Sequence, residues 1–363
     1  MTALGPQNDG IDSVTLEVFR NKLESIAEEM GQVLIRSAYS PNIKERQDCS
    51  TALFDADGRM VAQAEHIPVH LGAMPDAVAA VMESNPGPGD AYILNDPFEG
   101  GTHLPDVTIV STLAPNEEVI GYAVTRAHHA DIGGMTPGSM PAGAVEIYQE
   151  GLRLPGVELR SGGDLNTDVL EIILANVRNR TERQADLRAQ LAAHDRAAGR
   201  LAELIGDYGR RTVERAFDGV IDYSHARMAD ELAAFPDGTY DARDVLEGDG
   251  ATEDDIPIEV SITVDGTTVD VDFAGSAEQC AGNMNAPLSV AKSAVYFVVR
   301  SITDPEIPPN HGSYVDIDVS APIGTIVNPE PPAAVVGGNV ETSQRLTDVV
   351  FAAFAEAAPQ RVP

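Results

Sequence analysis

The sequence around residue 100 reads NDPFEGGTHLPD (residues 95–106), and a second polar stretch further on reads RAHHADIGG (residues 126–134). Two apolar runs rich in β-branched residues, 107–113 and 119–125, lie between these stretches and flank a short polar loop. This pattern predicts a β-hairpin. Pairing about the loop places Leu113 opposite Val119, so the start of the first strand meets the end of the second.

That pairing gathers polar side chains at the open end of the hairpin. His103 and Asp106 precede the first strand, and His128 and His129 follow the second. Pro105 disfavours a helical backbone at its neighbour, so His103 and Asp106 belong to a turn that can aim both side chains at one point. Two imidazoles and a carboxylate that converge suit a divalent ion. The register leaves open which of the two adjacent histidines takes part.

A second hairpin offers a fourth ligand. The turn at residues 55–58 separates the strand-like runs 49–54 and 60–64, as in tight hairpins. Asp48 stands at the open end of this hairpin, as His103 does on the other, and is the candidate fourth ligand. Single histidines at strand ends are commonly surface residues, so the prediction of a metal site depends on the convergence of several such groups.

Two further histidines follow the second hairpin. His66 and His70 have the spacing of a helical ligand pair, but Pro68 lies between them and disfavours that helix. We expect both to line the cleft or to have a structural role. The glycines at positions 100, 101, 133 and 134 allow the backbone to approach a small site closely or to adopt positive φ.

Length and composition set wider limits. With 363 residues the chain can form two domains or one large one. No apolar run approaches the roughly twenty residues that span a bilayer, and the N-terminus lacks the pattern of a secretory signal, so we expect no membrane association and a cytoplasmic protein. The two cysteines match no ligand or disulfide spacing.

The charge of the chain is strongly negative. Acidic residues number 57 against 24 basic ones, giving a formal charge of -33, and only Lys22, Lys44 and Lys292 are lysines. Nucleic acid is excluded as an expected partner, because the phosphate backbone would be repelled. The acidic residues are spread along the whole chain, which indicates a surface adapted to molar salt, as in a halophile.

Periodicity predicts an α+β fold with mixed sheets. We expect a disordered leader at residues 1–12, an N-terminal α+β domain with the metal site at 13–165, a helical segment at 166–235, and an incomplete β-rich domain at 236–363. Helical spacing of apolar residues marks the middle segment, and strict alternation at Ile258, Val260 and Ile262 marks a strand in the last.

Three stretches resemble one protein family. They are residues 95–106, residues 126–139 and GGNVETSQ at residues 337–344. All three resemble the hydantoinase B family, which includes the B subunits of N-methylhydantoinases, the C-terminal half of 5-oxoprolinase, the B subunits of caprolactamases and the alpha subunits of acetone carboxylases. The resemblance extends from about Val14 to the last residue.

This resemblance implies a division of labour. A partner of the A type, an ATPase of the actin-like class, uses ATP to phosphorylate a small cyclic amide or imide, and the B-type component opens the activated ring with a metal and water. The implied metal ligands are Asp48, His103, Asp106 and His128. We expect zinc, with manganese and iron as alternatives. His129 and Asp131 are expected to orient the ligands or to move the proton.

Two other hypotheses stay open. In the first, the chain resembles the alpha subunit of an acetone carboxylase, and its metal centre joins an activated ketone to bicarbonate. In the second, it is a truncated component that keeps the fold and contacts its partner without catalysis, because family members usually continue past the point where this chain stops. The complete ligand set favours catalysis, and hydrolysis of a cyclic amide is the main expectation.

Overall fold

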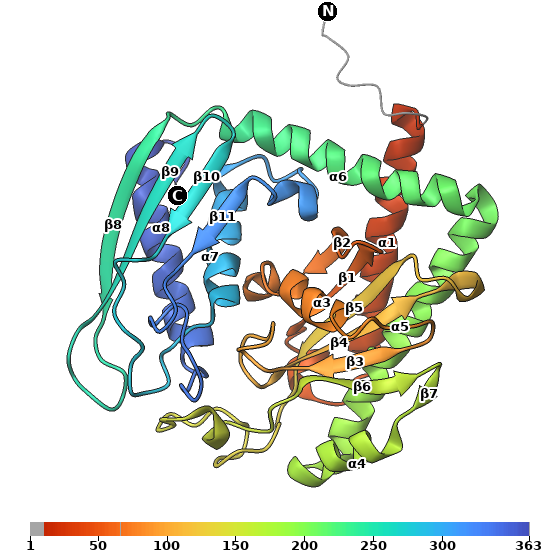
Figure 1. The fold of residues 1–363 in the computed structure, drawn as a ribbon, viewed down its shortest axis with the longest axis horizontal. Helices are drawn as coiled ribbons and strands as arrows, with labels where there is room; N and C mark the ends of the chain where they lie inside the picture. The colour runs from red at the N-terminus through yellow and green to blue at the C-terminus, as the bar shows by residue number, and fades with distance from the viewer. Residues whose placement is uncertain (1–10, 66, 363) are drawn as a thin grey trace, which may run out of the picture.

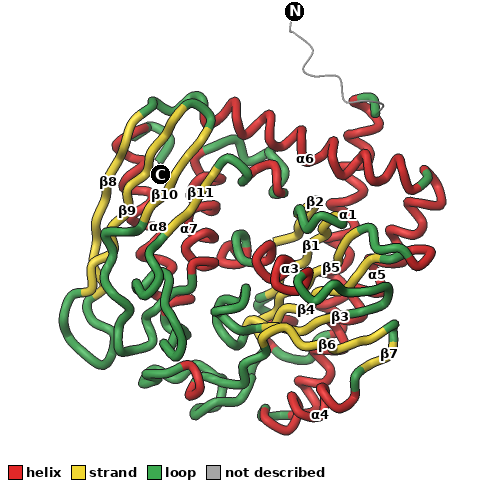
Figure 2. The backbone as a smooth tube through the Cα atoms, viewed as in Figure 1, coloured by secondary structure: helices red, strands yellow, loops and turns green. Residues whose placement is uncertain are grey.

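The protein has an α+β fold with two sheets, as expected (Figures 1 and 2). The computed structural model describes residues 11–65 and 67–362. Most of the expected leader, and also His66, therefore lie outside the described residues. Asp12 is described: its Oδ1 accepts hydrogen bonds from the amides of Val14 and Thr15, both at 3.0 Å, and caps the first helix.

The larger sheet has seven strands, and all neighbours in it are antiparallel. Their order is β2-β1-β5-β4-β3-β6-β7, so the two predicted hairpins lie side by side. The strands are β1 (Cys49–Asp55), β2 (Met60–Glu65), β3 (Ala91–Leu94), β4 (Asp106–Leu113), β5 (Gly121–His128), β6 (Pro155–Ser161) and β7 (Asp164–Leu165).

The hairpin β4–β5 forms with a register different from the predicted one. Leu113 pairs with Gly121 and not with Val119. The loop is longer than expected, because residues 115–117 form a short 3₁₀ turn and the amide of Ile120 still bonds to the carbonyl of Leu113, at 2.9 Å. A shift of two residues leaves every side chain on its face of the sheet, so the predicted meeting of the strand ends is preserved.

Helices cover both faces of this sheet. On one face lie α1 (Ser13–Ser37) and α5 (Arg180–Tyr208), which pack with Leu53 and Ala123 in one hydrophobic cluster. On the other lies α3 (Met74–Met82), which packs with Phe54 and Val124. Since strand residues alternate between faces, the even-numbered residues of β5, including Arg126 and His128, belong to the α3 face.

The second sheet lies on the other side of the molecule (Figure 1). Its order is β11-β10-β9-β8, with β10 and β11 parallel; the strands are β8 (Gly238–Leu246), β9 (Ile256–Asp265), β10 (Thr268–Asp272) and β11 (Ile317–Ser320). In β9 buried and half-buried residues alternate, as predicted. Two amphipathic helices cover this sheet, α7 (Leu288–Ile302) and α8 (Ser343–Ala357).

The helical middle segment joins the two sheets. It consists of α4 (Thr167–Asn176), α5 and α6 (Arg210–Leu232), and α6 runs from one sheet toward the other (Figure 1). Among the described helices none is both long and apolar enough to cross a membrane. The other helical segments are short: α2 (Pro41–Lys44), η1 (Pro68–His70), η2 (Pro115–Glu117), η3 (Ile147–Gln149), η4 (His311–Ser313) and η5 (Gly338–Thr342).

The expected domain boundaries coincide with changes of secondary structure, after β7 and between α6 and β8. One hydrophobic cluster nevertheless contains buried residues of both sheets, for example Val124 of β5 and Val295 of α7. The division into a metal domain and a β-rich domain therefore stays a prediction.

Candidate metal centre

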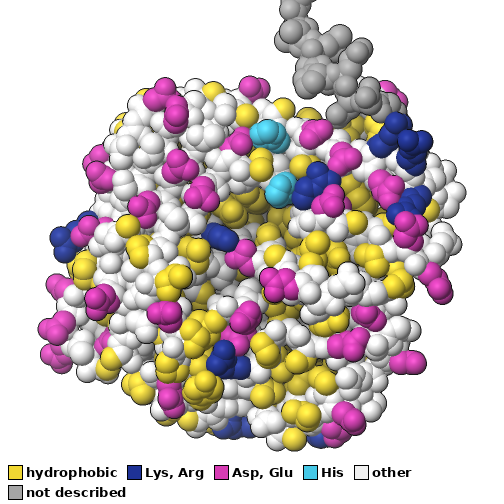
Figure 3. All heavy atoms as spheres, viewed as in Figure 1, with side chains coloured by type: hydrophobic (Ala, Val, Ile, Leu, Met, Phe, Trp, Pro, Cys, Tyr) yellow, Lys and Arg dark blue, Asp and Glu magenta, His cyan; other side chains and the backbone are white. Residues whose placement is uncertain are grey.

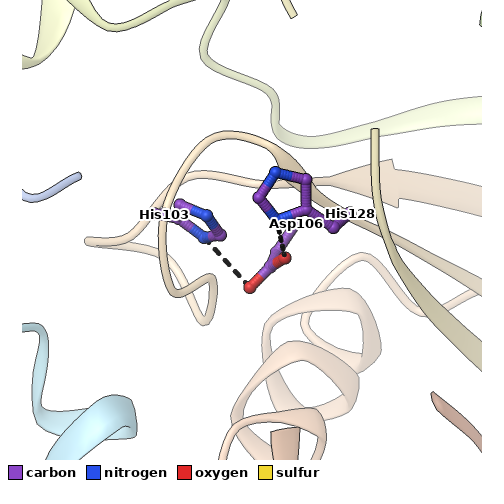
Figure 4. Close-up of side chains that lie close together, drawn as sticks. All are labelled: His103, Asp106 and His128. Carbon is purple, nitrogen blue, oxygen red and sulfur yellow. Dashed lines mark ion pairs between the residues drawn. The ribbon is translucent and has the colours of Figure 1, made fainter. Parts of the chain in front are cut away.

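Asp106 and His128 are cross-strand partners at the open end of the β4–β5 hairpin. Nδ1 of His128 lies 3.6 Å from Oδ1 of Asp106, and Nδ1 of His103 lies 3.0 Å from Oδ2 of the same carboxylate. The two imidazole rings are tilted toward each other, with centroids 5.0 Å apart (Figure 4). The structure thus brings together three of the side chains that the sequence placed at this end of the hairpin, and their binding of a metal stays a prediction.

The turn that carries His103 is fixed by buried hydrogen bonds. The amide of Asp106 donates to the carbonyl of His103, at 3.0 Å, and the hydroxyl of Thr102 donates to Oδ2 of Asp106, at 2.7 Å. The side chain of Asn95 donates to the carbonyl of Leu104, at 2.8 Å. These contacts fix the backbone of the turn and the orientation of the Asp106 carboxylate.

Two more side chains complete the cluster. Oδ2 of Asp48 lies 3.5 Å from Nδ1 of His128, and Nε2 of His70 lies 3.6 Å from Oδ2 of Asp106. Asp48, His70 and Asp106 offer ligand atoms that all lie within 4.8 Å of one another. Asp48 was predicted, whereas His70 was not assigned as a ligand. We call these five residues the cluster: Asp48, His70, His103, Asp106 and His128.

His70 reaches the cluster without the helix that Pro68 disfavours. Residues 68–70 form the 3₁₀ turn η1, and Nδ1 of His70 pairs with the hydroxyl of Ser50 on β1, at 2.9 Å. Fixing Nδ1 in this way leaves Nε2 facing Asp106. Alternation along β1 could have placed the side chain of Ser50 on the α3 face from the sequence alone. That His70 lies next to Ser50 depends on tertiary packing, which local patterns do not give.

The donor set fits a divalent metal ion. Four of its buried atoms have no hydrogen-bond partner among the described residues: Nε2 of His70, both ring nitrogens of His103 and Oδ1 of Asp106. Buried polar atoms are rarely left without a partner. Ligands bound to one ion at about 2.0–2.2 Å lie about 3–4 Å apart, and the four pairs of ligand atoms given above are 3.0–3.6 Å apart. Imidazole and carboxylate together suit zinc, manganese and iron.

Burial and mutual contacts shift the pKa values in the cluster. Burial, with repulsion from His103, lowers the pKa of His128 to about 3, so this imidazole is neutral near pH 7 and free to bind a cation. Burial works against ionisation of Asp106, but His103 and His70 hold its pKa well below the ordinary value. Burial and the neighbouring Asp106 raise the pKa of Asp48.

The structure does not bring the side chains of His129 and Asp131 to the cluster. Nε2 of His129 contacts Oε1 of Gln190 on α5, at 2.9 Å, because His129 belongs to the opposite face from His128. Its amide does donate to the carbonyl of Pro105, at 2.8 Å, next to the metal-binding turn. The predicted role of His129 in orienting ligands therefore has support only through its backbone.

Asp131 is surrounded by hydrogen-bond donors of its own loop and of Arg178, which lies between α4 and α5. Its carboxylate accepts hydrogen bonds from the amides of Gly133 and Gly138, at 2.9 and 3.1 Å, and from the amide and guanidinium of Arg178, at 2.9 and 3.0 Å. These donors hold its pKa below the ordinary value although burial opposes ionisation. Such contacts are typical of a residue that shapes a loop, and proton transfer by Asp131 stays a prediction.

Two named relatives match nearly the whole chain. A 5-oxoprolinase of Dictyostelium discoideum is 38% identical over 357 residues, which are 95% of this chain and 28% of that protein. The B subunit of a putative D-/L-hydantoinase from a Pseudomonas species is 33% identical over 371 residues, which are 97% of this chain and 62% of that protein. The chain thus spans less than two thirds of the length of both relatives.

Solved structures show the same fold. The ATP-dependent caprolactamase from Pseudomonas jessenii superimposes with a TM-score of 0.91 at 30% identity, covering 97% of this chain and 62% of that one. A nucleotide-free acetone carboxylase gives a TM-score of 0.86 at 19% identity, covering 95% and 48%, and shows likeness of fold alone. The family model described as hydantoinase B/oxoprolinase matches residues 12–363, so the chain belongs to the hydantoinase B/oxoprolinase family.

Proposed function

We propose that this chain is the B-type component of an ATP-dependent enzyme that hydrolyses a small cyclic amide or imide. The observation that carries the proposal is the cluster, in which five buried or half-buried ligand groups converge in a chain 30% identical to an ATP-dependent caprolactamase. The likeness to acetone carboxylase is one of fold, so it does not favour ketone carboxylation over amide hydrolysis.

Asp48, His103, Asp106 and His128 would hold the metal, with His70 as a fifth ligand. A divalent ion bound there would supply Lewis acidity and would make water a nucleophile near neutral pH. The two carboxylates would offset the charge of the ion, and the low pKa of His128 keeps a nitrogen lone pair available at neutral pH. Thr102 and Ser50 hold Asp106 and His70 in the orientation that binding requires.

ATP would act through a partner protein. The carbonyl carbon of an unactivated amide is a weak electrophile. Phosphorylation of the amide oxygen would make this carbon more open to attack by water. The chain has no Gly-x-x-x-x-Gly-Lys-Ser/Thr loop for nucleotide phosphates. The relative named as the B component of a hydantoinase supports a complex with an A-type ATPase, which would carry out that step.

The test is the metal content of the purified chain. Protein prepared in molar potassium chloride is analysed by elemental mass spectrometry, with His103→Ala as the variant. His225→Ala is the matched control, because His225 is exposed and pairs with Asp316 at 2.8 Å, outside the cluster. We expect about one zinc, manganese or iron per chain in the wild type and control, and loss of it in His103→Ala.

Activity is tested next with the A-type ATPase. We expect release of the ring-opened product from cyclic amides only when ATP and both proteins are present, without a requirement for bicarbonate. A wild-type protein that is folded but takes up no metal when zinc, manganese or iron is supplied would overturn the proposal and leave a non-catalytic, partner-binding component as the better account.

A further inference from the structure

Arg126 is fully buried on β5, where an unpaired charge would be costly. Its Nε donates to the hydroxyl of Thr108, at 2.8 Å, and its Nη2 donates to the carbonyls of Ala73 and Gly100, at 3.3 and 3.2 Å. In the described part of the chain Nη1 has no hydrogen-bond partner. One guanidinium therefore joins a strand side chain and two loop carbonyls.

Each of these contacts falls close to a member of the cluster. Ala73 follows His70 by three residues, Gly100 precedes His103 by three, and Thr108 follows Asp106 by two. Arg126 itself precedes His128 by two, on the same face of the sheet. The guanidinium thus joins the three segments that carry the three histidines and Asp106: it contacts residues near 70–73 and 100–108, and it belongs to the third segment, 126–128.

We propose that Arg126 is a positioning residue, whose planar guanidinium holds these three segments at the spacing that the metal requires. The inference rests on the proposed metal centre and adds a residue that binds no metal itself. The inference follows from the number of segments that this one side chain joins. Few residue types can make so many contacts at once. Arginine presents five N–H donors in a rigid fork, whereas the lysine ammonium is a flexible point charge.

The proposal is tested by removing the fork. Arg126→Lys keeps a nitrogen donor in the buried site and loses the planar fork, so it should weaken metal binding. Thr108→Val removes only the acceptor of the Nε donor and replaces it with a group of similar shape, so it should weaken metal binding less. Asp48, His70, His103, Asp106 and His128 are unchanged in both variants.

Arg183 provides the matched control. It is another buried arginine, 2% exposed, but it pairs with Asp186 at 2.9 Å on α5, the helix that covers the opposite face of the sheet. Arg183→Lys should cost comparable stability, because it too weakens a buried charge-assisted contact. If buried arginines act only through general stability, both lysine variants should affect metal binding equally.

The experiment measures zinc affinity by competition with a chromophoric chelator, and the visible spectrum of the cobalt-substituted chain, on wild type, Arg126→Lys, Thr108→Val and Arg183→Lys. We expect about a 10- to 100-fold loss of zinc affinity and an altered cobalt spectrum in Arg126→Lys. We expect a smaller loss in Thr108→Val, and wild-type affinity and spectrum in Arg183→Lys. Circular dichroism establishes that each variant is folded.

The outcomes distinguish this inference from the proposed function. If the wild type binds no metal, the proposed function fails. If the wild type binds metal and both Arg126→Lys and Thr108→Val bind it with unchanged affinity and spectrum, the positioning role fails while the metal centre stands. Should Arg126→Lys not fold, Thr108→Val decides by itself: wild-type affinity overturns the inference, and a loss supports it.

Discussion

The imidazole of His70 faces the carboxylate of Asp106, with Nε2 3.6 Å from Oδ2, and Ser50 holds the other ring nitrogen at 2.9 Å. Nε2 has no hydrogen-bond partner among the described residues. Nε2 of His70 is therefore a buried nitrogen that faces Asp106 and is able to bind a metal ion. In this respect His70 resembles the ligands that the sequence indicated.

His70→Ala should therefore weaken metal binding. We expect zinc affinity to fall by about 100-fold or more, because loss of a direct ligand should exceed the 10- to 100-fold effect of an outer contact. Titration with zinc against a chelator measures the change, and His225→Ala, on the exposed pair with Asp316, serves as the control. Equal zinc affinity in both variants would show that His70 is not a metal ligand.

Sequence reasoning found the hairpin ends but not everything that meets there. The sequence predicts that Asp106 and His128 lie near each other, because local patterns reveal both strands of the hairpin. The error of two residues in the predicted register leaves each side chain on the same face of the sheet. The choice between His128 and His129 was also available in principle, since alternation along β5 puts only His128 on the face of Asp106. His70 was not assigned as a ligand, because its position depends on the packing of η1 beside β1.

The glycine pairs were read correctly as places of close backbone approach. A Cβ on Gly101 would lie 2.5 Å from the carbonyl oxygen of Asn95, and one on Gly134 would lie 2.5 Å from that of Glu150. The partners of such glycines are far away in the sequence or in a loop, so local patterns predict the requirement for glycine without naming what it packs against. The same limit applies to the strand order of the large sheet.

Asn95 should matter for both stability and metal binding. Its side chain donates to the carbonyls of Leu104 and Leu152, at 2.8 and 3.0 Å, and accepts from the amide of Leu154, at 2.7 Å. Asn95→Ala leaves these buried groups without partners, so we expect a loss of about 3 kcal/mol or more in unfolding free energy. Urea unfolding measures it.

The control for this prediction is Asn176→Ala. Asn176 is exposed near the end of α4, and its side chain donates to the carbonyl of Ile172, at 2.8 Å, so its loss should cost about 0.5 kcal/mol or less. Similar losses in both variants would mean that the Asn95 hydrogen bonds do not secure the turn that carries His103.

Glu150 should make stability depend on pH in a defined direction. Burial raises the pKa of Glu150 to about 7, while the amides of Val335 and Val336, at 2.9 and 3.0 Å, favour its ionised form. Between the ordinary pKa of 4.5 and about 7, the folded chain holds more protons than the unfolded one. The contribution of Glu150 to stability is thus full below pH 4.5 and is lost as pH rises through 7.

Glu150→Gln isolates this contribution, because the amide side chain can still accept from both backbone groups but does not ionise. Relative to wild type, the variant should gain stability as pH rises from about 5 to about 8. The difference in unfolding free energy between the two proteins cancels the titration of other groups. Glu253→Gln, at an exposed position, should show a flat difference, and a flat difference for Glu150→Gln as well would contradict the prediction.

The acidic surface predicts a dependence on salt. Acidic side chains are scattered over the visible face and do not gather in one patch (Figure 3), and the chain carries a formal charge of -33. At low ionic strength these charges repel one another and destabilise the compact state, whereas at 1 M salt the screening length is about 3 Å. We expect the melting temperature to rise by about 5 °C or more between about 0.1 and 1 M potassium chloride. Sodium chloride at equal ionic strength should give the same rise, because screening depends on ion charge and concentration. A melting temperature that is unchanged or falls in both salts would show that repulsion among the acidic side chains does not limit the stability of this fold.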